Sequence, residues 1–187
     1  MATIQNSLAF AQELIRQVLL PGEQAIDATA GNGHDTVFLA RLVGSKGKIW
    51  AFDIQVEAIK NTEERLEKEN LRQRVNLLLQ GHENMAVYIK KPVGAIMFNL
   101  GYLPGGDHSI ITRPDTTISA VKSGLKLLRP GGIMTIVMYT GHTDGGTEAA
   151  QLKRFCHTLN QKDYHVLSYC FLNQQNHPPQ LLAIEKR

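Results

Sequence analysis

Apolar and polar positions alternate along the chain in two rhythms, one typical of helices and one typical of strands. Between Asn6 and Leu20, apolar residues recur three or four positions apart, which predicts an amphipathic helix that ends at Pro21-Gly22. Short apolar runs bounded by glycine or polar residues predict buried strands over 24–28, 48–53, 75–79, 95–100, 133–139, 164–172 and 180–185. Further helical periodicity predicts helices over 35–42, 56–74, 115–128 and 147–161.

The order of these elements predicts the architecture. Strands and helices alternate through most of the chain, which is typical of a mostly parallel sheet covered by helices on both faces. The last two predicted strands are separated only by the polar segment 173–179, so they can form an antiparallel hairpin. We find no internal repeat or linker, and we predict an α/β fold in a single domain over residues 1–187.

Composition excludes several classes of protein. The 187 residues are 43% hydrophobic and 20% charged, an ordinary balance for a globular protein. Cys156 and Cys170 lack the spacing of a zinc site, so we expect no metal and two buried or half-buried thiols. No segment has the ~20 apolar residues of a membrane span and the first residues form no basic leader, so we predict a cytoplasmic protein that binds no membrane. The net charge of +3 permits an anionic partner without indicating one. The sequence does not decide between a monomer and a homodimer.

The strongest chemical signal is the segment 27–36, DATAGNGHDT, between the first predicted strand and the next helix. Gly31 and Gly33 let the backbone approach a ligand closely, and the start of the helix offers unpaired N–H groups. A dinucleotide-binding turn would carry a third glycine and face a pyrophosphate, whereas this turn lacks that glycine and begins with an acid. An acid there suits a ligand with a cationic amino group. The candidate ligand-binding residues are Asp27, Gly31, Asn32, Gly33 and Asp35.

A second acid ends the next predicted strand. Asp53 follows Gly33 by twenty residues, and a carboxylate at that place can accept both hydroxyl groups of a ribose, with Gln55 assisting it. The glycine turn and Asp53 each have an ordinary explanation when taken alone. A glycine-rich turn is weak evidence, and an aspartate at a strand end is often a helix cap. The two features in order, within one βαβ unit, favour a ligand site.

These residues resemble the motifs of class I S-adenosylmethionine-dependent methyltransferases, and the resemblance covers nearly the whole chain. It implies a Rossmann-like, seven-stranded, mostly parallel sheet with an antiparallel C-terminal hairpin, and S-adenosylmethionine as the cofactor. By the same resemblance, the glycine turn faces the methionine part of the cofactor and Asp53 faces the ribose. The segment 80–83 matches the part beside the adenine. Many members carry an aspartate there, whereas this chain offers His82 and Glu83, so either side chain can contact the base.

The fourth predicted strand ends in residues that suit an amine acceptor. Asn99 and Tyr102 occupy the first and last places of the Asn-Pro-Pro-Tyr motif of nucleobase amino-group methyltransferases, although both prolines are absent. The Asn99 carbonyl can accept a hydrogen bond from an acceptor amine, and Tyr102 can pack beside a planar base. The alternative is a strand that simply ends in a glycine turn. We favour the functional interpretation, because a buried asparagine without a partner is costly.

Further candidates lie on loops that we expect to border the same crevice. Arg113 can bind a phosphate, and Tyr139 is a candidate for contact with the acceptor. His142 can shuttle a proton or contact RNA, or be an ordinary surface histidine. An alkylamine must lose a proton before it can attack a methyl group, and Asp107, His108 and His142 are candidates to receive it.

Beyond the cofactor motif, the chain resembles one specific group. Segments 98–104, 106–108, 112–114 and 178–179, with the glycine turn, resemble the small bacterial rRNA-methylase-like (YtqB-like) family, associated with the tRNA 5-aminomethyluridine methyltransferase MnmM. This resemblance implies methyl transfer to the exocyclic amine of 5-aminomethyl(-2-thio)uridine at the tRNA wobble position. The partner would be the anticodon stem-loop of tRNA, whose phosphates would meet Arg113, Lys122 and Lys126.

Three other functions compete with this one. A methyltransferase of rRNA or of a small metabolite is the nearest, and the absence of an appended RNA-binding domain slightly favours the small molecule. A cofactor-binding scaffold without activity is disfavoured by Asn99 and Tyr102 beside the expected methyl site. A nicotinamide enzyme is disfavoured because the turn lacks its third glycine.

Overall fold

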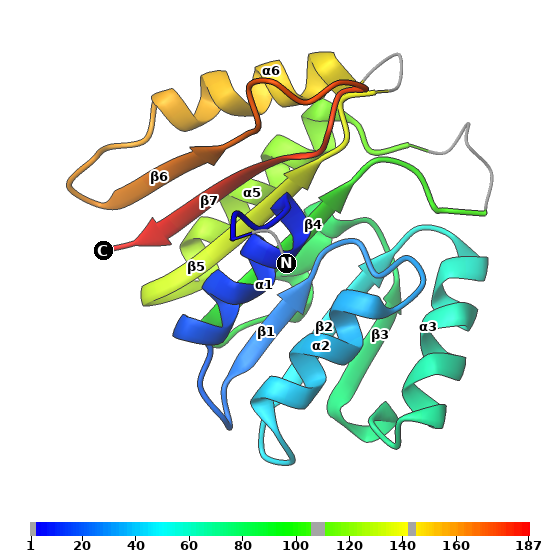
Figure 1. Ribbon diagram of the computed structural model, residues 1–187. Coiled ribbons are helices and arrows are strands. Elements are labelled where there is room, and N and C mark those ends of the chain that lie inside the picture. The colour runs from blue at the N-terminus through cyan, green and yellow to red at the C-terminus, as the bar shows by residue number, and fades with distance from the viewer. Residues whose placement is uncertain (1–2, 106–110, 142–144) are drawn as a thin grey trace.

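In the computed structural model, which describes residues 3–105, 111–141 and 145–187, seven strands form one sheet with helices on both faces (Figure 1). The strand order is β3-β2-β1-β4-β5-β7-β6. The strands are β1 (Gln24–Asp27), β2 (Lys48–Asp53), β3 (Val75–Leu79), β4 (Val93–Leu100), β5 (Leu128–Met138), β6 (Tyr164–Tyr169) and β7 (Gln180–Lys186). The α-helices are α1 (Ser7–Val18), α2 (His34–Val43), α3 (Val56–Lys68), α4 (Met85–Tyr88), α5 (Pro114–Leu127) and α6 (Gly145–His157).

The pairing of the strands confirms the predicted sheet. Strands β1 to β5 pair in parallel, whereas β7 is antiparallel to both of its neighbours, β5 and β6. The two last strands therefore form the antiparallel C-terminal hairpin that the sequence predicts. No helix among the described residues is long and apolar enough to cross a bilayer.

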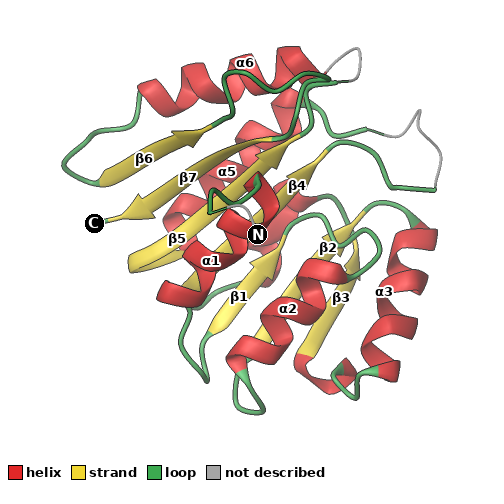
Figure 2. Ribbon diagram, viewed as in Figure 1, coloured by secondary structure: helices red, strands yellow, loops and turns green. Residues whose placement is uncertain are grey.

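The core lies in two layers, one on each face of the sheet. Figure 2 shows α1 and α2 in front of the sheet and α5 behind it. Ala95 and Met97 of β4 belong to the buried cluster that contains α1, α2 and α3, whereas Ile96 and Phe98 belong to the cluster that contains α4, α5 and α6. Successive residues of a strand point to opposite faces, so a strand covered on both sides must be apolar nearly throughout. That property made β4 recognisable in the sequence as a run that is apolar except for Asn99 near its end.

Helix α3 ends at Lys68, six residues before the predicted end at position 74. Asn70 adopts φ of 56°, and the N–H of Leu71 donates to the carbonyl of Leu66 at 2.8 Å. Asparagine tolerates this left-handed conformation, and the bond pattern is that of a helix cap with an apolar residue packed after it. Leu71 is buried by this cap, so it extends the apolar period beyond the helix itself. Because the apolar spacing continues through Leu71, the sequence predicted the end of this helix too late in the chain.

Strand β5 begins at Leu128, five residues before the predicted start at position 133. Leu128 pairs with Val93, and the next regular pair joins Ile133 to Ala95, so the intervening residues form an irregularity within the strand. Gly131 there adopts φ of 68°. The residues between the predicted helix and the predicted strand therefore form a bulge inside β5.

The two cysteines differ in environment. Cys156 on α6 is buried, and this burial raises the pKa of its thiol to about 11. Cys170, just after β6, is exposed, which corrects the expectation of two buried or half-buried thiols. Strand β6 is a sheet edge and ends at Tyr169, so position 170 falls outside the paired region.

Candidate active site

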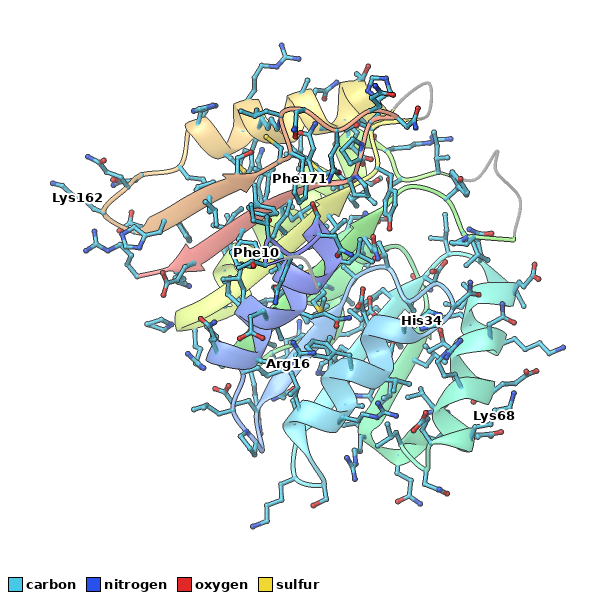
Figure 3. All side chains as sticks on the ribbon, viewed as in Figure 1. Phe10, Arg16, His34, Lys68, Lys162 and Phe171 are labelled. Atoms are coloured by element: carbon cyan, nitrogen blue, oxygen red, sulfur yellow. The ribbon has the colours of Figure 1, made fainter. Side chains whose placement is uncertain are left out.

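The carboxyl ends of the parallel strands open onto a cavity of about 850 Å³. It lies where the chain leaves β1 and β4 for opposite faces of the sheet, the place at which open α/β sheets bind ligands. Its walls are residues 28–32, 34–35, 53–55, 80–83, 99–104, 111–114 and 116, with Tyr139 and Thr147. His34, labelled at the start of α2 in Figure 3, belongs to this lining and locates the cavity in that view.

The glycine turn between β1 and α2 forms one wall. Gly31 and Gly33 adopt φ of 52° and 80°, conformations that side chains rarely permit. A Cβ atom at Gly33 would lie 3.0–3.2 Å from Thr62 on α3, so the glycine also allows that helix to approach. The Thr62 hydroxyl donates to the Gly31 carbonyl at 3.0 Å, which holds the turn against α3.

Asn32 ties the same turn to its neighbours. Its side-chain amide donates to the carbonyl of Pro104 at 3.2 Å and its side-chain oxygen accepts from Asn61 at 3.0 Å. Arg65 donates to the Asn32 carbonyl at 2.6 Å. Asn32 therefore joins the turn to the segment after β4 as well as lining the cavity.

Asp27 lies beneath the cavity rather than on its surface. It is 1% exposed and is absent from the lining. Its carboxylate accepts hydrogen bonds from the Thr36 hydroxyl at 2.5 Å and the Thr29 amide at 3.1 Å. Burial, together with the nearby charge of Asp35, raises the pKa of Asp27 to about 7. Asp27 thus organises the turn from below, whereas we had expected it to face the ligand's amino group.

Asp35 is the acid of this turn that reaches the cavity. It is half-buried on the first turn of α2, and burial raises the pKa of its carboxyl group. Gln12 of α1 donates to one oxygen at 3.0 Å and the Asn99 side chain donates to the other at 3.4 Å. Sequence patterns gave no signal for Gln12, because α1 precedes the motif and the glutamine is one polar position among several.

Replacing Asp27 with asparagine is expected to remove a pH dependence of stability. Because the pKa of Asp27 rises from 3.8 to about 7 on folding, the folded protein binds that proton more tightly, and wild type loses stability as pH rises between these values. His82, whose pKa is lowered from 6.5 by burial, acts oppositely and costs stability as pH falls. His82 is present in both proteins, so its contribution cancels, and the difference reports Asp27 together with the neighbouring Asp35, whose titration responds to the Asp27 charge. Urea unfolding measures the free energy of unfolding of both proteins from about pH 4 to about pH 8. As the pH rises, the variant should gain stability relative to wild type. A difference in unfolding free energy that does not change with pH would contradict the assignment.

Asp53 is held at the cavity by two backbone groups. One carboxylate oxygen accepts from the Gly31 amide at 2.9 Å and the other from the Gln55 amide at 3.0 Å. Each oxygen retains a lone pair for a further donor. The sequence placed Asp53 correctly at the end of β2 beside the glycine turn, and Gln55 also lines the cavity.

Replacing Asp53 with alanine is expected to weaken cofactor binding roughly tenfold or more, because a charge-assisted hydrogen bond contributes about 1.5–3 kcal/mol. Asp53→Asn keeps an acceptor oxygen without the charge and should fall between wild type and the alanine variant. Calorimetric titration with S-adenosylmethionine measures the three affinities, with thermal unfolding as the check on folding. Unchanged affinity in a folded alanine variant would remove Asp53 from the binding site.

His82 and Glu83 follow β3, where the short helical turn η2 (His82–Asn84) begins. The His82 Nδ1 lies 3.1 Å from the Ala28 carbonyl and donates to it, while Nε2 is buried without a partner among the described residues. Burial lowers the pKa of His82, so the ring is neutral at pH 7 and Nε2 is an open acceptor. Glu83 lies against Gly81, whose missing side chain leaves room for its carboxylate. Both residues line the cavity.

The side of the cavity where the sequence predicts the methyl acceptor is built by the ends of β4 and β5. The Asn99 backbone amide donates to the Thr29 hydroxyl at 2.7 Å, which fixes β4 against the turn after β1. The Asn99 side-chain oxygen is buried and has no partner in the described part of the chain. Tyr102 and Tyr139 are 42% and 38% exposed and line the same side. Burial and the nearby Asp35 and Tyr102 raise the pKa of Tyr139, so its phenol keeps its proton near neutral pH.

The three predicted phosphate-binding residues do not lie together. Arg113 precedes α5, is exposed and lines the cavity. Lys122 and Lys126 lie farther along that helix, ~14 and ~20 Å from Arg113 at 1.5 Å per residue. Neither belongs to the lining, and the Lys122 ammonium lies 5.6 Å from the centre of the Phe155 ring. The spacing along α5 therefore separates the lysines from the cavity.

Three candidates for proton transfer lie outside the described residues. Asp107 and His108 fall in 106–110, and His142 falls in 142–144. They stay predictions from the sequence alone.

Similar proteins of known structure or function include several that are named methyltransferases or methylases. Residues 49–185 match the family described as "Putative rRNA methylase". A Clostridium thermocellum structure named a "putative rRNA-methylase" is 48% identical and covers all of both chains, with a TM-score of 0.98. A Streptococcus mutans "putative methyltransferase", solved in complex with SAH, is 40% identical over 99% of this chain and 100% of its own, with a TM-score of 0.91.

A curated relative from Arabidopsis thaliana is named "tRNA (mnm(5)s(2)U34)-methyltransferase, chloroplastic". It is 37% identical in an alignment of 168 positions that covers 84% of this chain. The match spans 61% of the relative's own length. The chain thus belongs to the family described as "Putative rRNA methylase", and its fold is that of the class I S-adenosylmethionine-dependent methyltransferases.

Proposed function

We propose that this protein transfers a methyl group from S-adenosylmethionine to the exocyclic amine of 5-aminomethyl(-2-thio)uridine at the wobble position of tRNA. One observation carries the proposal: the Asn99 carboxamide contacts the Asp35 carboxylate in the cavity. On one side of this contact lies the glycine turn, and on the other lie the partly exposed Tyr102 and Tyr139. The name and identity of the Arabidopsis relative support the choice of acceptor.

The residues present fit the cofactor. The glycine turn leaves its backbone open to a ligand, Asp53 presents a fixed carboxylate, and the unpartnered His82 Nε2 offers a buried acceptor. S-adenosylmethionine, when bound, supplies an electrophilic methyl group on a positively charged sulfur. In this arrangement Asp53 would hold the ribose, His82 and Glu83 would lie at the adenine, and Asp35 would face the cationic methionine end.

Residues of the acceptor side would prepare the amine. An alkylamine is largely protonated near neutral pH, and its lone pair can form the new N–C bond only after that proton has left. The Asn99 oxygen, now without a partner, gains one when an amine approaches, provided that the carboxamide turns to expose it. Asp35 is the described carboxylate that Asn99 contacts, and it joins Asp107, His108 and His142 as a candidate to receive the proton.

The remaining acceptor residues suit an RNA loop. Sequence-specific RNA recognition uses unstacked bases that pack on aromatic side chains, and Tyr102 and Tyr139 provide such surfaces at the cavity. Arg113 can pair with a phosphate of the anticodon stem-loop from the same side. Methyl transfer to tRNA with and without the aminomethyl group tests the proposal, and the nucleosides of tRNA from a deletion strain give the corresponding result in cells.

Ribosomal RNA is the second candidate acceptor. The family description and the name of the Clostridium thermocellum structure favour it. Stacking tyrosines and Arg113 suit an unpaired rRNA base equally well. Asn99 could orient an exocyclic amine of an rRNA base as well, so the name and identity of the Arabidopsis relative are what favour the aminomethyl group of the wobble uridine.

A further inference from the structure

A buried glutamate stands outside both the cofactor motif and the acceptor motif. Glu148, in the first turn of α6, is 3% exposed and forms no ion pair with any described residue. Its two carboxylate oxygens accept hydrogen bonds from two threonine hydroxyls, Thr112 and Thr117, each at 2.7 Å. A buried carboxylate is costly unless its oxygens are satisfied, and here each threonine satisfies one of the two oxygens.

Two helix ends help to stabilise the carboxylate. Glu148 lies in the first turn of α6, and Thr117 lies in the first turn and a half of α5. Unpaired N–H groups give the start of a helix a partial positive charge, which favours a negative group nearby. The carboxylate therefore joins the two helices at their cavity ends without a lysine or arginine among the described residues.

Thr112 connects this carboxylate to the acceptor side of the cavity. Its backbone amide donates to the Gly101 carbonyl at 3.2 Å, and the preceding Ile111 forms a β-bridge with Tyr102. Ile111, Thr112 and Arg113 all line the cavity. The segment 111–113 is thus held on one side by the end of β4 and on the other by Glu148.

We propose that Glu148 is a positioning residue for the methyl acceptor. Through Thr112 it fixes the segment that carries Arg113 and that pairs with Tyr102, so it sets the shape of the acceptor side. The hydrogen bonds of Asp53, Gly31 and His82 on the cofactor side involve neither Glu148 nor Thr112, and the charge of Glu148, which also acts on His82, is kept when only the Thr112 hydroxyl is removed. Loss of the hydrogen bond between Thr112 and Glu148 should therefore weaken binding of the methyl acceptor and leave cofactor binding unchanged. The inference rests on the proposed methyl transfer.

The two threonines provide a matched pair of variants. Thr112 and Thr117 donate to the same carboxylate at the same distance, but Thr117 is fully buried on α5 and does not line the cavity. Replacement by valine removes the hydroxyl from either residue while keeping the branched shape. Thr112→Ser restores the donor and serves as the conservative variant.

Steady-state methylation of 5-aminomethyluridine tRNA should separate these variants. We expect Thr112→Val to raise the acceptor KM by about tenfold, as the loss of one hydrogen bond to a charged group would. Thr112→Ser should return it to within about threefold of wild type. Thr117→Val should lower Tm comparably but leave the acceptor KM unchanged, and calorimetry should find cofactor affinity unaltered in all three. Equal rises in KM for the two valine variants, or a rise in neither, would overturn the proposal.

Hydrogen exchange tests the anchor without any acceptor. Amides of residues 101–105 and 111–113 should exchange faster in Thr112→Val than in wild type, and Thr117→Val should leave them unchanged. Unaltered exchange in Thr112→Val would refute the anchoring role. If wild type methylates no aminomethylated tRNA, the proposed acceptor is wrong, while the exchange result still decides whether Glu148 holds this segment.

Discussion

Transfer RNA that carries 5-aminomethyluridine at the wobble position is expected to accept a methyl group from this protein, and the same tRNA without the aminomethyl group is expected to accept none. The reason is chemical, since removal of the aminomethyl group removes the nitrogen lone pair that forms the new bond. A site built to hydrogen-bond an amine also rejects the analogue that lacks it, commonly by about 10⁴-fold. The Asn99 oxygen, buried and without a partner among the described residues, would be left unsatisfied by such an analogue.

The measurement uses S-adenosylmethionine labelled in its methyl group with three RNAs in parallel: the aminomethylated tRNA, the same tRNA without that group, and ribosomal RNA. Nucleoside mass spectrometry then identifies the labelled base. The Asp53→Ala variant serves as a control for label that does not depend on the cofactor site. Equal labelling of both tRNAs, or labelling of rRNA alone, would refute the proposed acceptor.

The sheet could be predicted from the sequence because of how parallel strands are buried. A strand covered on both faces is apolar nearly throughout, as β4 is, and its neighbours follow at the spacing that a connecting helix imposes. The glycine turn and the acid at the end of β2 could be predicted as well, because they occupy fixed places in the chain. Both features are local, so one sequence is enough to reveal them.

Contacts between distant segments could not be predicted in this way. The path of the turn decides whether Asp27 or Asp35 faces the cavity. The Thr29 amide and the Thr36 hydroxyl hold Asp27 below the cavity by hydrogen bonds. Glu148 is 36 residues from Thr112 along the chain, and a carboxylate bound by threonines has no motif. Helix α5 gives a related case, because Arg113 precedes it at the cavity, whereas Lys122 and Lys126 lie on later turns of the helix and outside the cavity lining.

Replacing Asn99 with alanine is expected to lower turnover on the order of 10²-fold while cofactor affinity stays within about threefold of wild type. Asn99 lies at the end of β4 with its backbone held by Thr29, so the alanine variant keeps the path of the strand and loses only the carboxamide. The Asp35 carboxylate loses one donor but keeps Gln12, which is why the cofactor side should change little. The loss falls on the acceptor amine, whose lone pair is no longer directed toward the methyl group.

Asn160→Ala provides the matched control, because it removes the same carboxamide from an exposed position that lies outside the cavity lining. Calorimetry with S-adenosylmethionine and steady-state methylation of aminomethylated tRNA separate binding from turnover in both variants. A fall in kcat and in kcat/KM by the same factor would mark an interaction made in the transition state. Turnover within about twofold of wild type, a barrier change below roughly 0.5 kcal/mol, would exclude Asn99 from orienting the acceptor. A tenfold loss of cofactor affinity would instead assign Asn99, through Asp35, to the cofactor side of the cavity.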